Sequence, residues 1–297
     1  MGMLHEIAPK QYRVEYRKVR ARKRDRVILY LDNEFLAADR TALRLPTVEK
    51  TGPADYQYLF AIDETRYFSV LDTDETARLI RALTEKEPGK WKSIPERGVR
   101  YLFPRDVSYA AILSSQLVGW YRRNRFCGRC GHPTEHGENE RMMHCPNCKN
   151  LIYPQICPSV IVGLFHEGKL LVTRYNPAHR EVSNGKLFQA PVHEALLAGY
   201  IEIGETAEEA VRREVFEEVG LKVRNIRYYK STPWPFSGSL LFSYLCEVDG
   251  DPTIRLEERE LCMAEFRTPE EMPDRSREVS LTSAIMEDFR NGRLPLK

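Results

Sequence analysis

The chain has 297 residues, of which 42% are hydrophobic, so it is long enough to bury the core of one large domain or of two small ones. Its 45 basic and 43 acidic residues give a formal net charge of +2, which excludes wholesale polyanion binding and leaves only a local basic patch for such a role. The sequence has no run of about 18 apolar residues, and its first ten residues lack the apolar centre of a signal peptide, so we expect a cytoplasmic protein.

Residues 1 to about 122 have a mixed pattern, which predicts an α/β N-terminal domain. Runs rich in β-branched and aromatic residues predict strands at 26–31 and 58–62, and the spacing of apolar residues predicts helices at 74–85 and 106–122. The last helix would dock against a core through residues that recur at roughly helical spacing: Ala110, Ile112, Leu113, Leu117 and Trp120.

The segment from Arg13 to Arg26 holds eight basic residues, these two included, interleaved with Val, Tyr and Ala. A strip of this kind on one face could hold an RNA backbone. The alternative is that these charges are the solvated exterior of a strand.

Four cysteines follow in two C-x-x-C pairs that are separated by fourteen residues: Cys127, Cys130, Cys145 and Cys148. Two such pairs can place four thiolates around one zinc ion, and glycine, proline and asparagine between or beside them suit tight turns. A site closed by four cysteines leaves no position for water, so we expect a structural zinc ion. Residues 123–156 hold few aliphatic residues and would depend on this ion. We expect the remaining cysteines, Cys157, Cys246 and Cys262, to be buried and inert.

From residue 157 to 297 the pattern predicts an α/β sandwich with a mixed sheet. Strands are expected at 160–164 and 170–173 around a turn at Glu167-Gly168. A charged helix, further strands and a final helix at about 280–290 follow them.

The charged helix carries the most informative pattern. Thr206 and Glu209 form a capping-box start and Gly220 is a helix stop, which predicts one helix over 207–218. Glu214, Glu217 and Glu218 are spaced to share one face, and Ala207, Val211 and Val215 share another that would anchor the helix. Carboxylates this close repel each other unless a cation neutralises them, and oxygen ligands favour Mg²⁺ or Mn²⁺. The alternative is a solvated acidic helix face.

The segment from Gly199 to Leu221, with Glu205, Arg213, Glu214, Glu217, Glu218 and Gly220 in their places, resembles the Nudix box at every defining position. The segment Ser231-Thr-Pro-Trp-Pro-Phe-Ser-Gly-Ser239 resembles the signature of the NADH pyrophosphatase branch, in which a zinc ribbon also precedes the Nudix domain. The resemblance implies an α+β chain: an N-terminal domain at 1–122, a zinc ribbon at 123–156 and a Nudix α/β/α sandwich at 157–297.

The resemblance also implies roles for individual residues. Glu214, Glu218, Glu260 and the Ala198 carbonyl would bind Mg²⁺ or Mn²⁺, with Glu217 nearby and Glu205 paired with Arg213 to hold the loop. The substrate would contact Glu140, Tyr153, Tyr200, Thr232, Pro233, Trp234, Pro235, Phe236, Ser237, Gly238, Ser239 and Thr282. In that family the pocket is completed across a homodimer. The stretch 176–194 is longer than the family pattern leads us to expect.

Three functional hypotheses follow. The first is hydrolysis of NADH or NAD⁺ to nicotinamide mononucleotide and AMP, and the second is removal of the NAD cap from RNA 5′ ends by the same chemistry. A Nudix hydrolase of another nucleoside diphosphate derivative, such as ADP-ribose, is a variant of the first. The third is a zinc-ribbon nucleic-acid binder with an inactive Nudix domain, against which the intact glutamate helix argues.

Overall fold

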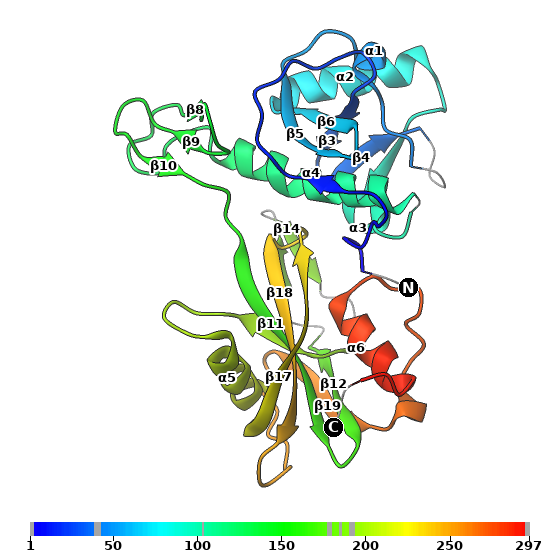
Figure 1. Cartoon of the computed structure of the whole chain (residues 1–297), viewed down its shortest axis with the longest axis vertical. Helices are drawn as coiled ribbons and strands as arrows, with labels where there is room; N and C mark the ends of the chain where they lie inside the picture. Colours follow the sequence, from blue (N-terminus) through cyan, green and yellow to red (C-terminus); the bar gives the residue numbers. More distant parts are fainter. Residues whose placement is uncertain are drawn as a thin grey trace. The chain divides into compact units, whose positions relative to one another are not determined.

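The computed structural model describes residues 3–38, 43–102, 104–176, 180–183, 186–189 and 194–294 of the chain. These residues form two compact units, one from Leu4 to Gln155 and the other from Ile156 onward together with Met3. Figure 1 labels many of the elements of each unit. Within the described ranges, no helix combines the length and the apolar character needed to cross a bilayer.

The first unit contains a four-stranded sheet of order β1-β5-β6-β2 and a three-stranded sheet of order β3-β4-β7. The strands are β1 (Tyr12–Arg13), β2 (Arg26–Ile28), β3 (Tyr30–Leu31), β4 (Glu34–Ala37), β5 (Tyr56–Ile62), β6 (Thr65–Val70) and β7 (Lys92–Pro95). The single strand predicted at 26–31 is wrong, because the chain changes sheets at Leu29: β2 pairs with β6 and β3 pairs with β4. Leu29 itself is buried in an apolar core beside Val27 and Leu36.

Four helices accompany these sheets in the described part of the unit: α1 (Val48–Thr51), α2 (Thr73–Lys86), α3 (Glu96–Val99) and α4 (Arg105–Arg123). The two predicted helices are confirmed as α2 and α4. In α4, Ala110, Ile112 and Trp120 are buried as predicted, but Leu113 and Leu117 are only half-buried. The buried surface of α4 is wider than the apolar stripe because it includes serines, whose hydroxyls donate to backbone carbonyls: Ser108 to Leu102, Ser114 to Ala110 and Ser115 to Ile112.

Near the end of α4, the guanidinium group of Arg122 joins the helix to the sheets. It donates to the backbone carbonyls of Leu71 and Tyr30, both at 2.9 Å, and to that of Val70 at 3.3 Å. Burial lowers the pKa of Arg122 below its usual value. The bonds therefore satisfy both a partly buried charge and carbonyls at strand ends.

The zinc-ribbon region forms a small antiparallel sheet of order β10-β9-β8. Its strands are β8 (Glu135–His136), β9 (Met143–His144) and β10 (Leu151–Ile152). Two-residue strands bury little apolar surface, so this region needs another source of stability.

The second unit is built on one mixed sheet, in which β15-β12-β11-β18-β17 are neighbours, β16 pairs with β11 and β19 pairs with β12. The strands are β11 (Cys157–His166), β12 (Lys169–Tyr175), β15 (Glu194–Ala195), β16 (Leu197–Tyr200), β17 (Val223–Trp234), β18 (Ser239–Val248) and β19 (Leu261–Arg267); β13 (Arg180–Ser183) and β14 (Lys186–Gln189) pair only with each other. The β11–β18 pair is parallel, and the other pairs are antiparallel.

Two helices cover opposite faces of this sheet, α5 (Ala207–Val219) and α6 (Leu281–Arg290), as Figure 1 shows; a short 3-10 turn, Pro269–Glu271, precedes α6. Along β11, Val160, Val162 and Leu164 pack in the core with α5, and Ile161 and Phe165 pack in the core with α6. This alternation places a strand between two cores and confirms the predicted α/β/α sandwich with a mixed sheet.

The three cysteines outside the C-x-x-C pairs behave differently from one another. Cys246 is buried on β18 as predicted, but Cys157 and Cys262 are exposed. Cys157 lies at the start of β11, before the strand enters the core, and Cys262 alternates with the buried Leu261 on β19.

We predict that Arg122→Met lowers the free energy of unfolding by about 3 kcal/mol, because several carbonyls at strand ends lose a charged donor. Urea unfolding followed by circular dichroism measures the change. Arg123→Met is the matched control, since Arg123 is exposed and its loss should cost within about 0.5 kcal/mol. Equal stability of the two variants would show that the Arg122 bonds contribute nothing net.

Candidate functional site

The four paired cysteines lie together in the zinc-ribbon region of the first unit. Their sulfur atoms all lie within 4.8 Å of one another, with Cys127 Sγ 3.6 Å from Cys148 Sγ and Cys130 Sγ 3.5 Å from Cys145 Sγ. A tetrahedral zinc site with Zn–S bonds of about 2.3 Å has sulfur–sulfur edges of about 3.8 Å. All four cysteines are free, so the cluster fits a zinc ion and not disulfides.

Both cysteine turns have the same backbone design. The amide of Gly131 donates to the Cys127 carbonyl, and the amide of Lys149 donates to the Cys145 carbonyl four residues before it. Gly131 and Lys149 both have positive φ, 73° and 61°. Glycine adopts this conformation without strain, but lysine rarely does, so the sequence predicted both turns and gave no signal for the conformation of Lys149.

The predicted glutamate helix is confirmed as α5. The Thr206 hydroxyl accepts from the Glu209 amide, the Glu209 carboxylate accepts from the Thr206 amide, and Gly220 ends the helix in the left-handed region with φ 70°. Val211 and Val215 are fully buried against the sheet. These contacts fix the rotation of the helix and therefore the direction of its glutamates.

Arg213 joins this helix to the loop before it. Its Nε donates to Glu205 Oε1 at 2.9 Å, its Nη2 to the Tyr200 carbonyl at 2.8 Å and its Nη1 to Glu214 Oε1 at 2.7 Å. Glu205 also accepts from the Glu202 amide at 3.0 Å. The expected pair of Glu205 with Arg213 is therefore present, within a network that spans the whole loop.

Glu218 is the most unusual carboxylate of the unit, because only 2% of its surface is exposed. Neither carboxylate oxygen has a hydrogen-bond partner among the described residues, although the backbone amide of Ala198 lowers the pKa of Glu218 somewhat. Burial first, and then the charges of Glu260 and Glu214, raise the pKa of Glu218 to about 9. A bound cation would stabilise the ionised carboxylate and so offset both the burial and the repulsion. The residues present therefore fit a metal ion.

The neighbouring carboxylates differ from Glu218 in exposure and partners. Glu214 is half-buried, and burial raises its pKa. Glu217 is exposed, and its Oε2 lies 3.0 Å from Arg213 Nη1. A Cβ at Gly199 would lie 1.9 Å from Glu214 Oε1, so a side chain at position 199 would force this carboxylate out of its place. Within the described ranges, the cysteine cluster is the only group of three or more possible ligands that lie within 4.8 Å of one another. The carboxylates of α5 are therefore neighbours but do not form a compact group of ligands, and Glu214 is paired with Arg213.

The segment after β18 caps the C-terminal end of α5, a feature that the sequence did not indicate. The Arg255 amide donates to the Val219 carbonyl at 2.8 Å, and the Glu257 amide donates to the Glu218 carbonyl at 2.9 Å. Backbone donors of this kind satisfy the last carbonyls of a helix. They depend on the path of the chain, so no residue type reveals them.

The segment 231–239, which resembles the family signature, forms the end of a β-hairpin. Ser231 to Trp234 pair with Ser239 to Phe242 as the last part of β17, and only residues 235–238 form the turn. The Trp234 and Phe236 rings meet edge to face at 4.9 Å. Two predicted substrate contacts, Thr232 and Ser239, are buried, because alternate strand residues face the core. Pro235 is buried, Pro233 and Gly238 are half-buried, and Ser237 is exposed.

The remaining predicted contacts fall in three places. Tyr200 is half-exposed beside the α5 loop. Tyr153 is also half-exposed and donates to Glu140 Oε1 at 3.1 Å, but both residues belong to the first unit, so their approach to the Nudix-box residues remains a prediction. Thr282 lies in the first turn of α6.

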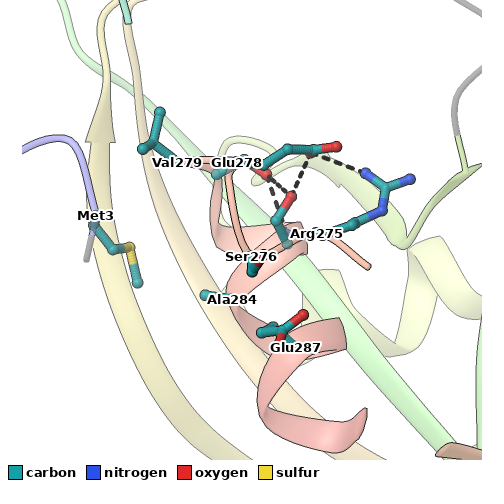
Figure 2. Close-up of a pocket in the computed structure, with 9 residues that line it drawn as sticks. Met3, Arg275, Ser276, Glu278, Val279, Ala284 and Glu287 are labelled. Carbon is teal, nitrogen blue, oxygen red and sulfur yellow. Dashed lines mark hydrogen bonds and ion pairs between the residues drawn. The ribbon is translucent and has the colours of Figure 1, made fainter. Parts of the chain in front are cut away.

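A small cavity of about 20 Å³ lies beside the start of α6, and Figure 2 shows the residues that line it: Met3, Arg275, Ser276, Glu278, Val279, Ser280, Ser283, Ala284 and Glu287. Arg275 and Glu278 form an ion pair at 3.0 Å there. This volume holds about one water molecule, so the cavity is too small for a nucleotide.

We predict that Glu218→Gln stabilises the protein in buffer that lacks Mg²⁺ and Mn²⁺. Because the folded pKa of Glu218 lies above the ordinary value, the folded state holds this proton more tightly than the unfolded state. The resulting stability is complete below pH 4.5 and is lost as the pH rises to about 9. At pH 8 the variant should therefore melt at a higher temperature than wild type.

Differential scanning calorimetry at pH 5 and pH 8, without a chelator so that the zinc ribbon keeps its ion, measures this difference. Adding Mn²⁺ should raise the melting temperature of wild type more than that of Glu218→Gln. Exposed Glu202 provides the control variant Glu202→Gln. A Glu218→Gln protein that loses as much stability as wild type between the two pH values would refute the assignment.

Two stretches of the chain match known domain families. Residues 122–153 match the NADH pyrophosphatase zinc ribbon domain, and residues 157–288 match the NUDIX domain. A Salmonella typhi protein described as NAD-capped RNA hydrolase NudC is 41% identical over 158 residues, which cover 53% of this chain and 57% of that protein. The protein of the same description from Salmonella paratyphi B is 40% identical over the same length. The match thus spans a little over half of these relatives.

Among solved structures, a NUDIX hydrolase from Nitrosomonas europaea aligns with 56% of this chain and 91% of its own, at 20% identity and a TM-score of 0.44. The two family matches confirm the resemblance carried by the segment 199–221 and by the cysteine pairs. The chain therefore contains an NADH pyrophosphatase zinc ribbon, with a structural zinc site, followed directly by a Nudix domain.

Proposed function

We propose that this chain hydrolyses the pyrophosphate bond of NADH or NAD⁺ to give nicotinamide mononucleotide and AMP. The observation that carries the proposal is Glu218, a buried carboxylate without a hydrogen-bond partner among the described residues, next to Glu214 and Glu260. Such a group fits a site that binds a divalent cation together with phosphate oxygens. The relatives described as NAD-capped RNA hydrolases support a substrate that contains NAD.

Under this proposal, Glu214, Glu218, Glu260 and the Ala198 carbonyl hold Mg²⁺ or Mn²⁺. When bound, the ion supplies polarisation of the phosphoryl oxygens and a bound water of lowered pKa. The chain's own contribution is positional: Arg213 holds the loop through Glu205 and the Tyr200 carbonyl, and Gly199 leaves space for the Glu214 carboxylate. The oxygen of water bonds to one phosphorus and a proton of that water is released, while the bridging P–O bond breaks and the other phosphate departs with its mononucleotide.

Flat apolar faces are available for the rings of a dinucleotide at two places in the second unit. Trp234 and Phe236 stand at the hairpin end, and Tyr200 is half-exposed next to the Nudix-box glycine. Rings of this kind bind bases by stacking. We propose that Tyr153 and Glu140 complete the pocket from the second copy of a homodimer.

We also propose domains at 1–122, 123–156 and 157–297.

Removal of an NAD cap from RNA is a second candidate, which the basic segment favours. Residues 14–25 lie between β1 and β2 without forming a strand, which argues against the strand-exterior alternative. Arg20, Arg22 and Arg24 are exposed there, and their side chains form no ion pair with any described residue. Unpaired exposed arginines can contact the phosphates of an RNA that extends from the cap.

We predict that the wild type with Mg²⁺ or Mn²⁺ cleaves NADH and NAD⁺ and that Glu218→Gln loses at least about a hundredfold in kcat/KM, which corresponds to roughly 2.7 kcal/mol of transition-state stabilisation. Chromatography of the nucleotide products measures both proteins against NADH, NAD⁺, ADP-ribose and a nucleoside triphosphate. A variant as active as wild type would contradict the metal site. Much faster turnover of ADP-ribose than of NADH would contradict the substrate and leave the chemistry intact.

We predict that reversing the charges of Arg20, Arg22 and Arg24 to glutamate weakens binding of NAD-capped RNA and leaves cleavage of free NADH unchanged. Three lost phosphate contacts should reduce the slope of log K against log salt by about 2. Filter binding across a salt series measures this slope. The control is the same reversal at Arg81, Lys86 and Lys92, which are exposed elsewhere in the first unit. An equal effect from both triple variants would exclude a specific RNA path along the basic segment.

A further inference from the structure

Glu260 lies in a tight turn that is bonded to α5. The amides of Glu260 and Leu261 donate to the Glu257 carbonyl at 3.1 and 2.9 Å, and the Glu257 amide donates to the Glu218 carbonyl at 2.9 Å. The Glu257 amide thus joins the turn to the last turn of the helix that carries Glu214 and Glu218, three residues before Glu260. The position of this turn therefore sets the distance between Glu260 and the helix.

Asn176 bonds to this turn from the opposite side. It follows directly after β12 and is the first residue of the long stretch 176–194. Its backbone amide donates to the Glu260 carbonyl and its side-chain Nδ2 donates to the Glu258 carbonyl, both at 2.8 Å. The first bond continues the pairing of β12 with β19 beyond Tyr175 and Leu261. The second bond depends on the asparagine side chain alone.

We propose that Asn176 is a positioning residue that holds Glu260 at the metal site. This inference rests on the proposed function, because it takes Glu260 as a ligand of the divalent ion. A turn fixed on one side only, by the Glu257 amide, could move its carboxylate relative to Glu218. The two bonds from Asn176 fix the other side, so the site loses less conformational freedom when the ion binds. The long stretch thus begins with a residue that supports the site.

Titration of Mn²⁺ followed by electron paramagnetic resonance tests the proposal without any substrate. Asn176→Ala removes the side-chain bond and keeps the backbone bond, and we expect its Mn²⁺ affinity to fall about three- to tenfold, the range for one lost neutral hydrogen bond. Asn176→Asp keeps the shape but replaces the donor with an acceptor, so it should be at least as weak. It provides the same test if the alanine variant does not fold.

The matched control is Asn291→Ala, because Asn291 Nδ2 also donates to a backbone carbonyl of the same unit, that of Glu287 at 2.6 Å. Its Mn²⁺ affinity should equal that of wild type. In a Glu260→Gln background, Asn176→Ala should cause no further loss, because Asn176 acts through Glu260. Unchanged Mn²⁺ affinity of Asn176→Ala, or an equal loss in both backgrounds, would overturn the proposal. A wild type that binds Mn²⁺ in this Asn176-dependent way but does not cleave NADH would refute the proposed function alone.

Discussion

The burial of the Glu218 carboxylate is the constraint on which the second unit depends. Its oxygens lie at the end of α5 without a hydrogen-bond partner among the described residues, and Glu214 and Glu260 add negative charge beside it. Burial and repulsion both oppose ionisation, so the site is stable as a neutral acid or with a cation, but not as a bare carboxylate. The fully buried Val211 and Val215 prevent the helix from rotating this group into water.

Arg213 allows the Glu214 carboxylate to change partner while the loop before α5 stays in place. Its guanidinium has enough donors to bind Glu205, the Tyr200 carbonyl and Glu214 at once, which a lysine could not do in the same geometry. If the Glu214 carboxylate leaves Arg213 to bind a cation, the bonds from Arg213 to Glu205 and to the Tyr200 carbonyl still hold the loop. The loop–helix geometry therefore does not depend on whether the ion is present, and only the Glu214 carboxylate has to move.

Local patterns in the sequence predicted the parts of the fold that depend on local physics. The capping box at Thr206, the stop at Gly220 and the apolar spacing of α5 each act within one or two turns, so the helix bounds followed from them. The division of the 26–31 strand at Leu29 depends on pairing with β6 and β4, far along the chain. The bonds from Asn176 and Glu257 to the site are also long-range, and they involve backbone carbonyls that any sequence would supply.

The zinc ribbon and the Nudix domain are stabilised by different chemistry. In the zinc ribbon, four thiols lie within 4.8 Å because two turns bring them together, and an ion takes the place of a hydrophobic core. In the Nudix domain an extensive apolar core already exists, and its stability offsets the cost of one buried carboxylate. We therefore expect the zinc-ribbon region to need its ion for folding, since little else holds those short strands. The ion proposed at Glu218 is not expected to be needed for folding.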